Sequence, residues 1–345
     1  MPLVPLCVIG GGSIGMRHIE CALASDVVDL TAVVEADADR RAALRDMGLP
    51  AVAGLDEVPP ATKGGVIATP TPNHAHMALD CLERGWAVLV EKPLTETLAD
   101  ADLLCVRAEE LGLPLITGHH RRCHPFVSHA RDMIARLGQL VAVQGIWSLR
   151  KHDTYYDPLW RRSAGAGPIL TNLSHEIDLL HCMVGGITEV SAMSSSAARG
   201  FEIEDTTALS LRFDNGALGS FVMSDAGASP WAFEAATGEN PAIAVRGGDP
   251  LRFIGMEGAL SFPSLALWQA SPGHPPDWQY PLVEEGGPDL AKVDGVAVQL
   301  DRFAAVVQGG QDALLATGRD GWRTMLVLDA VQAAARTGQT QTVAQ

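Results

Sequence analysis

Leu6-Cys7-Val8-Ile9-Gly10-Gly11-Gly12-Ser13-Ile14-Gly15 is the stretch that decides the fold of this chain. Its four apolar residues predict a buried strand, and the residues that follow the glycines predict a helix. In this setting Gly10 permits the tight turn, Gly12 lets the backbone approach a pyrophosphate, and Gly15 lets the helix pack closely on the strand. The helix N-terminus directs free N–H groups and partial positive charge at phosphates. The stretch therefore predicts a dinucleotide site.

The residue that ends the next apolar run bears on the choice of cofactor. Glu35 follows Leu30-Thr31-Ala32-Val33-Val34, twenty residues after Gly15. A carboxylate at this position accepts hydrogen bonds from the ribose hydroxyls of an adenosine and repels a 2′-phosphate. The sequence therefore favours NAD over NADP, with Arg40 as the nearby residue that could soften the preference.

Composition bounds the class of protein. The chain has 345 residues, enough for two domains with substantial cores, and its six cysteines lack C-x-x-C spacing, as expected of free thiols in a cytoplasmic protein. The first apolar run has no basic segment before it and no cleavage site, and no apolar run approaches the roughly 20 residues that cross a bilayer. The net charge of −16 disfavours nucleic acid and anionic membranes as partners.

Two kinds of pattern divide the chain. Helical and strand-like segments alternate as far as Gly118, which predicts a doubly wound parallel sheet whose ligands bind at the carboxyl ends of its strands. Later strands with turn signals between them, Trp231–Ala236 included, predict an α+β domain with a large, mostly antiparallel open sheet. We therefore place an NAD-binding Rossmann domain at 1–121 and a substrate-binding and oligomerisation domain at 122–345. Whether the last helices pack back on the first domain is left open.

Lys92 is the first candidate for catalysis. Glu91-Lys92-Pro93 follows the apolar strand Ala87-Val88-Leu89-Val90, so Lys92 lies at the edge of the sheet where a dinucleotide binds. Desolvation and the positive nicotinamide ring both lower the pKa of a lysine there, which lets it hydrogen-bond a substrate hydroxyl and pass on a proton. The alternative is a solvated lysine at a strand end.

His175 is the second candidate. It lies on a helix expected from Pro168 to about Val184, and helical spacing places Asn172 on the same face, with Thr171 beside it. Imidazole has the unperturbed pKa best placed to accept a hydroxyl proton near neutral pH. The alternative is a structural histidine hydrogen-bonded in the core.

A series of motifs along the chain carries a family resemblance. In order they are the glycine turn, Ala68-Thr69-Pro70-Thr71-Pro72-Asn73-His74, Glu91-Lys92-Pro93, Gly118-His119-His120-Arg121-Arg122, Trp160-Arg161, the glycine-led helix with His175 and Asp178, and Thr317-Gly318-Arg319-Asp320-Gly321. Over nearly its full length the sequence resembles the glucose-fructose oxidoreductase / inositol dehydrogenase family (Gfo/Idh/MocA). The resemblance implies NAD(P)-dependent redox chemistry on sugars, cyclitols and related alcohols, with Lys92 and His175 catalytic. It also implies a homodimer or homotetramer formed through the open C-terminal sheet.

One position departs from the family pattern. Many members have an aspartate four residues before the histidine, whereas this chain has Thr171, followed by Asn172. Threonine cannot ionise. We therefore expect Lys92 and His175 to manage the proton, with Asn172 able only to orient.

The expected ligand contacts follow from these motifs. For the cofactor, the residues are Gly10, Gly12, Ser13, Ile14, Gly15, Glu35, Thr69, Pro70, Asn73, His74, Glu91 and Lys92. For the substrate, they are Arg121, Arg122, Lys151, Tyr155, Trp160, Arg161, Thr171, Asn172 and His175. Aromatic faces and hydroxyl-binding groups suit a neutral polyol, which the resemblance favours, while so many cations also allow a sugar acid or a carboxylated cyclitol. A solvated surface loop is the alternative for the basic and aromatic residues.

Several histidines occur in pairs, as metal ligands often do. Of the pairs His74/His76, His119/His120 and His175/His181, only the last has a carboxylate at helical spacing, Asp178. These three residues spread over two turns and do not converge on one point, whereas zinc needs three or four convergent ligands, so no metal is expected. The leading prediction is hydride transfer between a secondary alcohol and nicotinamide C4. The alternatives are an NAD-dependent glycoside hydrolase of the same fold and a non-catalytic regulator that binds dinucleotide and sugar. Loss of Lys92 or His175 would mark the regulator, and both residues are present.

Overall fold

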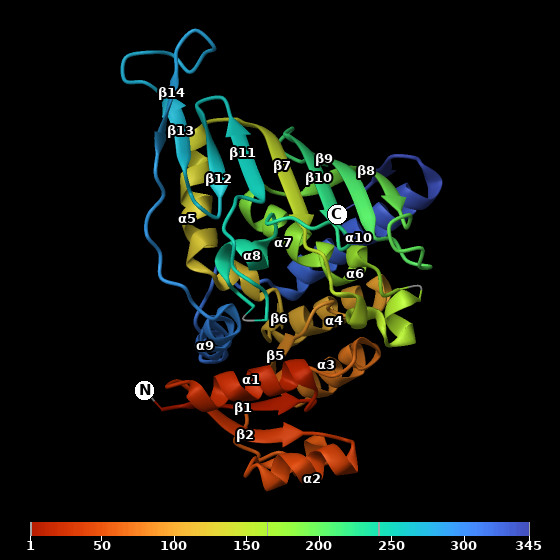
Figure 1. Cartoon of the computed structure of the whole chain (residues 1–345). Coiled ribbons are helices and arrows are strands. Elements are labelled where there is room, and N and C mark those ends of the chain that lie inside the picture. The colour runs from red at the N-terminus through yellow and green to blue at the C-terminus, as the bar shows by residue number, and fades with distance from the viewer. Residues whose placement is uncertain (1, 164, 241, 345) are drawn as a thin grey trace. The chain divides into compact units, whose positions relative to one another are not determined.

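The computed structural model describes residues 2–163, 165–240 and 242–344, which fall into two units (Figure 1). The first unit comprises Met1–Cys123 and Asp294–Met325, and the second comprises His124–Val293 and Leu326–Gln345. The segment Asp294–Met325 thus groups with the nucleotide-binding part of the chain, although it lies within the range 122–345 expected for the second domain.

The first unit contains the predicted parallel sheet. Its strands are β1 (Val4–Ile9), β2 (Val28–Val34), β3 (Ala51–Val52), β4 (Gly64–Ile67), β5 (Ala87–Val90) and β6 (Leu115–Thr117). Their order is β3-β2-β1-β4-β5-β6, and each neighbouring pair is parallel, which confirms the doubly wound fold. Because successive strand residues face opposite sides, Leu6 and Val8 enter one apolar cluster and Cys7 and Ile9 another. Burial on both faces explains the unbroken apolar run that opens the chain.

Helices cover this sheet. They are α1 (Ser13–Ala24), α2 (Ala38–Asp46), α3 (His74–Glu83), α4 (Leu98–Leu111) and α9 (Gly295–Val307), with short 3₁₀ turns at η1 (Leu55–Glu57), η2 (Thr71–Asn73) and η3 (His120–Cys123). The helix α9 belongs to this unit because Leu300 and Phe303 bury their side chains in the same cluster as Leu6 and Val8. A further helix, α10 (Gly318–Thr337), begins in the first unit and continues in the second.

The second unit is built on a nine-stranded sheet. Its strands are β7 (Leu140–Ser148), β8 (Ile187–Ser195), β9 (Thr206–Phe213), β10 (Leu218–Ser224), β11 (Leu251–Gly255), β12 (Gly258–Phe262), β13 (Leu267–Ala270), β14 (Leu282–Glu285) and β15 (Gln341–Thr342). Their order is β14-β13-β12-β11-β7-β10-β9-β8-β15. Among the described strands of this second sheet, only β7 and β10 pair in parallel, so the expected mostly antiparallel open sheet is confirmed.

Helices pack against one face of this sheet. They are α5 (Pro125–Ile134), α6 (Pro168–Thr171), α7 (Leu173–Met183), α8 (Phe233–Thr237) and the end of α10, with 3₁₀ turns at η4 (Ala135–Leu137), η5 (Asp153–Tyr156) and η6 (Leu159–Arg162). Val127 of α5, Ile177 of α7 and Val331 of α10 share one core with Val143 and Phe221 of the sheet. No helix in the described part of the chain combines the length and apolar character that crossing a membrane needs.

Two local predictions need correction. Trp231–Ala236 was expected to be a strand, but Phe233–Thr237 forms α8, because Gly238 ends the helix in the left-handed region and the Trp147 indole binds Glu234 at 2.9 Å. The helix that carries His175 is interrupted at Asn172, where α6 ends and α7 begins.

Candidate active site

The glycine turn in the first unit has the geometry that a dinucleotide needs. Gly10 adopts a φ of +102°, and a Cβ added to Gly15 would lie 1.9 Å from the carbonyl oxygen of Gly10. Both positions therefore require glycine for the fold itself. A Cβ on Gly12 would meet no atom within 4 Å, so the space over Gly12 is open. This open space fits a pyrophosphate that approaches the backbone.

The N-terminus of α1 adds donors to this space. The helix begins after Gly12 with no side-chain cap and no acidic residue in its first turn, and Ser13 and Ile14 are exposed there. The backbone N–H groups of the first turn are therefore not used by a side-chain cap, and the helix dipole favours an anion at this end. The residues present fit the phosphates of NAD.

Glu35 is held beside the glycine turn. Its carboxylate accepts hydrogen bonds from the backbone N–H groups of Gly11 and Asp37, both at 2.9 Å, and the side chain is almost fully buried. The guanidinium of Arg40 lies 3.2 Å from the same carboxylate. The predicted ribose-binding carboxylate is thus fixed in place, with a cation directly beside it.

We expect Glu35→Ser to raise the ratio of kcat/KM for NADP to that for NAD by tenfold or more. The substitution removes the carboxylate that repels a 2′-phosphate and leaves the Arg40 guanidinium free to bind the phosphate. Initial rates with both cofactors measure the ratio. In the double variant with Arg40→Ala the gain should largely disappear, and an unchanged ratio in the single variant would contradict the assignment of Glu35.

Glu91 and Lys92 lie at the same edge of the sheet, after β5. Nε2 of His18 is 2.8 Å from Oε1 of Glu91, and the backbone N–H of Lys92 donates to the other carboxylate oxygen at 3.2 Å. Burial raises the pKa of the Glu91 carboxyl, but the hydrogen bond with His18 and the charges of His18, His120 and Lys92 outweigh burial and lower the pKa to about 2. Glu91 is therefore a buried anion next to a half-buried Lys92.

His74 connects the loops that follow β4 and β5. Its ring nitrogens lie 2.9 Å from the carbonyl oxygens of Pro93 and Thr69, and the side chain is almost fully buried. Pro70 and Asn73 are exposed at this edge. His74 thus joins the two loops at Thr69 and Pro93, next to Lys92. Pro70 and Asn73 remain accessible to a cofactor.

The segment after β6, which carries two of the predicted substrate residues, is largely buried. Arg121 and Arg122 are 3% and 4% exposed, and Nη1 of Arg122 lies 3.3 Å from Oδ2 of Asp320, at the start of α10. The ion pair makes Arg122 part of the framework of the first unit. Burial, with the charges of Arg122 and Lys92, lowers the pKa of the adjacent His119 well below its ordinary value. The sequence named His119 only in a family motif and in a histidine pair considered for a metal, and it did not predict a neutral imidazole beside Lys92.

In the second unit, His175 lies in the first turn of α7 and is 7% exposed. The break before this helix holds Asn172, whose Oδ1 accepts hydrogen bonds from Nζ of Lys151 at 2.8 Å and from the hydroxyl of Thr171 at 2.9 Å. The structure therefore brings four predicted substrate residues, Lys151, Thr171, Asn172 and His175, to one end of α7.

The other predicted substrate residues form a stack on the loop before α6. The Arg161 guanidinium lies over the rings of Tyr155, at 4.2 Å, and Trp160, at 5.2 Å, and donates to the Tyr155 carbonyl at 2.8 Å. Nζ of Lys151 lies 4.8 Å from the centre of the Tyr155 ring. Trp160 is 63% exposed. The stack thus presents an aromatic surface in which the cations already have partners.

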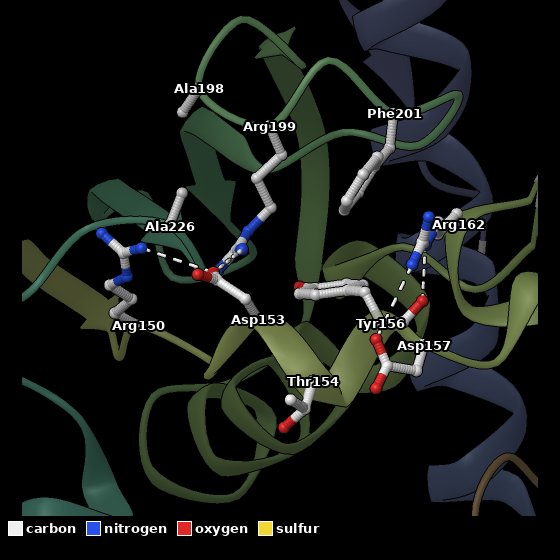
Figure 2. A pocket seen from close by; sticks show the side chains of 10 residues that line it. All are labelled: Arg150, Asp153, Thr154, Tyr156, Asp157, Arg162, Ala198, Arg199, Phe201 and Ala226. Atoms are coloured by element: carbon white, nitrogen blue, oxygen red, sulfur yellow. Dashed lines mark hydrogen bonds and ion pairs between the residues drawn. The ribbon is translucent and has the colours of Figure 1, made fainter.

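The same loop also lines a cavity of about 500 Å³ (Figure 2). Its walls are formed by Arg150, Asp153, Thr154, Tyr156, Asp157, Arg162, Ala198, Arg199, Phe201 and Ala226. Figure 2 shows Asp153 between Arg150 and Arg199, and Arg162 next to Asp157. The arginines of this cavity are therefore paired with aspartates, and its walls do not include the residues predicted to bind substrate.

A buried carboxylate that sequence reasoning missed holds this loop. Asp225 follows β10 and is 1% exposed. It accepts a hydrogen bond from the Tyr156 hydroxyl, and its oxygens lie 3.4 Å from Nζ of Lys151 and 3.4 Å from Nε of Arg199. A single aspartate at a strand end carries no sequence signal that would have identified this role. Among the residues with described positions, no group of three or more His, Cys, Asp or Glu side chains could hold a metal ion.

Comparison with known proteins agrees with this site. Residues 5–119 match an oxidoreductase family with an NAD-binding Rossmann fold, and residues 127–260 match the GFO/IDH/MocA C-terminal domain. A similar protein, 1,5-anhydro-D-fructose reductase from Ensifer adhaerens, is 30% identical over 227 residues, which cover 62% of this chain and 67% of that protein.

Solved structures share the whole fold. An oxidoreductase from Agrobacterium radiobacter in complex with NAD+, L-tartaric acid and magnesium superposes with a TM-score of 0.79 at 16% identity, covering 99% of this chain and 98% of that one. The WlbA dehydrogenase from Bordetella pertussis in complex with NADH and UDP-GlcNAcA gives a TM-score of 0.75 at 20% identity, with 99% of each chain covered.

The fold and the glycine turn define an NAD-binding oxidoreductase with a Rossmann domain. The chain belongs to the Gfo/Idh/MocA family, as the order of its motifs indicated. These matches confirm the predicted enzyme class, an NAD-dependent dehydrogenase.

Proposed function

We propose that this dehydrogenase oxidises a secondary alcohol of a sugar, cyclitol or sugar acid, and that Lys92 and His175 handle the hydroxyl proton. The observation that carries the proposal is the position of Lys92 at the carboxyl end of β5, directly after the buried anion Glu91. Lysine at this edge of the sheet lies beside the cofactor site, where ligands of such folds bind.

The chain would divide the chemistry between two side chains. When NAD is bound, its nicotinamide ring supplies the hydride acceptor. Lys92, directly after the buried anion Glu91, donates a hydrogen bond to the substrate oxygen. His175 accepts the hydroxyl proton as the carbonyl forms, since imidazole is suited to proton transfer near neutral pH. Gly12, the first turn of α1 and Glu35 would hold the pyrophosphate and the adenosine ribose.

A neutral polyol is the favoured substrate class, because three of the predicted substrate-binding cations already have partners within the protein. Arg122 pairs with Asp320, Lys151 lies beside Asp225, and Arg161 covers two aromatic rings. An arginine or lysine that already has a partner loses that interaction when it binds a substrate carboxylate, so the net gain is small. The similar reductase from Ensifer adhaerens is named for 1,5-anhydro-D-fructose, a neutral sugar derivative.

The test is NADH formation at mildly alkaline pH across cyclitols, aldoses, sugar acids and lactones. A steady increase in NADH with a neutral polyol supports the proposal. Release of a sugar from a glycoside without net NADH would instead support the NAD-dependent hydrolase. Binding of sugar and NAD with no turnover of any kind would support the non-catalytic regulator.

We also propose a homodimer or homotetramer formed through the nine-stranded sheet. Strands β7, β8, β10 and β11 expose Val141, Met193, Leu218, Val222 and Ile254 on the face opposite the helices. Exposed apolar side chains gathered on one face are typical of an interface. Light scattering after size exclusion should give a multiple of the 36.5 kDa chain, and Val222→Glu should shift the protein toward the monomer.

A further inference from the structure

We infer that Asn172 recognises substrate by donating hydrogen bonds from Nδ2 to the oxygen next to the reacting CH–OH, and that Lys151 is the positioning residue that fixes this orientation. The substrate class would then be a vicinal polyol. This inference rests on the proposed function and deepens it.

The orientation of the Asn172 amide follows from its neighbours. An ammonium group can only donate hydrogen bonds, so the amide atom 2.8 Å from Nζ of Lys151 must be the oxygen. The Thr171 hydroxyl also contacts this oxygen, at 2.9 Å. Nδ2 therefore points away from both groups. Within the described residues, no hydrogen bond uses Nδ2 of Asn172, and the side chain is partly exposed.

Lys151 is itself held firmly. Asp225 lies 3.4 Å from its Nζ, and the Tyr155 ring lies 4.8 Å away. The Tyr156 hydroxyl and Arg199 bind the same Asp225 carboxylate and fix it in turn, and both side chains are seen in Figure 2. Burial lowers the pKa of Lys151, and the charge of Asp225 opposes this shift. Asp225 thus offsets part of the cost of burying the Lys151 ammonium group, and Lys151 acts on substrate through Asn172.

The position of Asn172 explains which substrate oxygen it would bind. Asn172 is the N-cap residue of α7, and His175 follows three residues later. The backbone carbonyl oxygen of Asn172 accepts a hydrogen bond from the backbone N–H of His175 at 3.2 Å. Side chains at this spacing are neighbours on a helix face, with Cβ atoms roughly 5–6 Å apart. With the reacting hydroxyl on His175, the amide N–H groups would meet an oxygen on an adjacent carbon. An amide donor suits the lone pairs of a neutral hydroxyl or carbonyl.

The test compares two substrates in three proteins. The probes are the polyol with the highest kcat/KM in the panel above and its deoxy analogue lacking the hydroxyl next to the oxidised carbon. Asn172→Asp keeps the shape of the side chain but replaces the donor with an acceptor. We expect it to raise KM for the polyol roughly tenfold or more and to change KM for the deoxy analogue far less. Lys151→Met should have the same selective effect, smaller in size, because it releases the amide.

Controls separate this role from a structural one. Arg150→Met, on the exposed part of the same loop, should leave both KM values unchanged. The affinity for NAD and the thermal unfolding midpoint show whether each variant is folded, and calorimetric binding of both probes replaces kinetics for a variant that is folded but inactive. An unchanged ratio between polyol and deoxy analogue in Asn172→Asp would overturn the inference while the proposed function stands. A wild-type protein that oxidises no member of the panel would instead overturn the proposed function.

Discussion

Replacing Lys92 with alanine should lower kcat by about a hundredfold or more while leaving the affinity for NAD nearly unchanged, because general acid–base groups contribute on this scale. Steady-state rates at saturating NAD, with cofactor affinity from calorimetry, measure both quantities. Lys63→Ala is the matched control, since Lys63 is an exposed lysine in the same unit. Unchanged turnover in Lys92→Ala would remove Lys92 from the mechanism.

His175→Ala should cause a loss of similar size, and the two losses should not add. Both residues are proposed to serve one proton path, and once the path is broken a second substitution removes little more. The double variant compared with each single variant measures the coupling between them. Additive losses would show that Lys92 and His175 have separate roles.

The nucleotide-binding part of the fold could be predicted because its determinants are local. Gly10, Gly12 and Gly15 act within one turn, and Glu35 is reached by a single βαβ unit. The unbroken apolar run before Gly10 reflects a strand buried on both faces, which is a property of that strand alone. Sequence reasoning is strongest where the residues that fix a structure are close together along the chain.

The contacts of the second unit could not be predicted because they join distant segments. Asp225 lies 69 residues from Tyr156, and no periodicity connects them. The same holds for Lys151 and Asn172, which the sequence named separately as substrate residues without indicating that they bind each other. The strand predicted at Trp231–Ala236 failed for a related reason, since the contact between Trp147 and Glu234 spans 87 residues. Tertiary contacts of this kind override local propensity.

Two glycine substitutions should separate the fold of the nucleotide site from its function. Gly15→Ala places a methyl group 1.9 Å from the backbone oxygen of Gly10, so the strand and the helix must move apart. Overpacking of this kind typically costs about 1–3 kcal/mol, and the unfolding midpoint without NAD should fall. Gly12→Ala meets no atom within 4 Å and has a φ of −72°, which alanine adopts without strain. Its midpoint without NAD should therefore stay close to that of the wild type.

The response to NAD should then separate the wild type from Gly12→Ala. A ligand that binds only the folded state raises the unfolding midpoint with the logarithm of its concentration relative to Kd, so the wild type should gain stability as NAD is added. In Gly12→Ala the new methyl group occupies the open space over the turn, where we expect the pyrophosphate, and this gain should be lost. Thermal unfolding of both proteins over a range of NAD concentrations measures the effect. A wild-type-like gain in Gly12→Ala would show that the pyrophosphate does not pass over Gly12, and the cofactor would then have to be placed elsewhere along the carboxyl edge of the sheet.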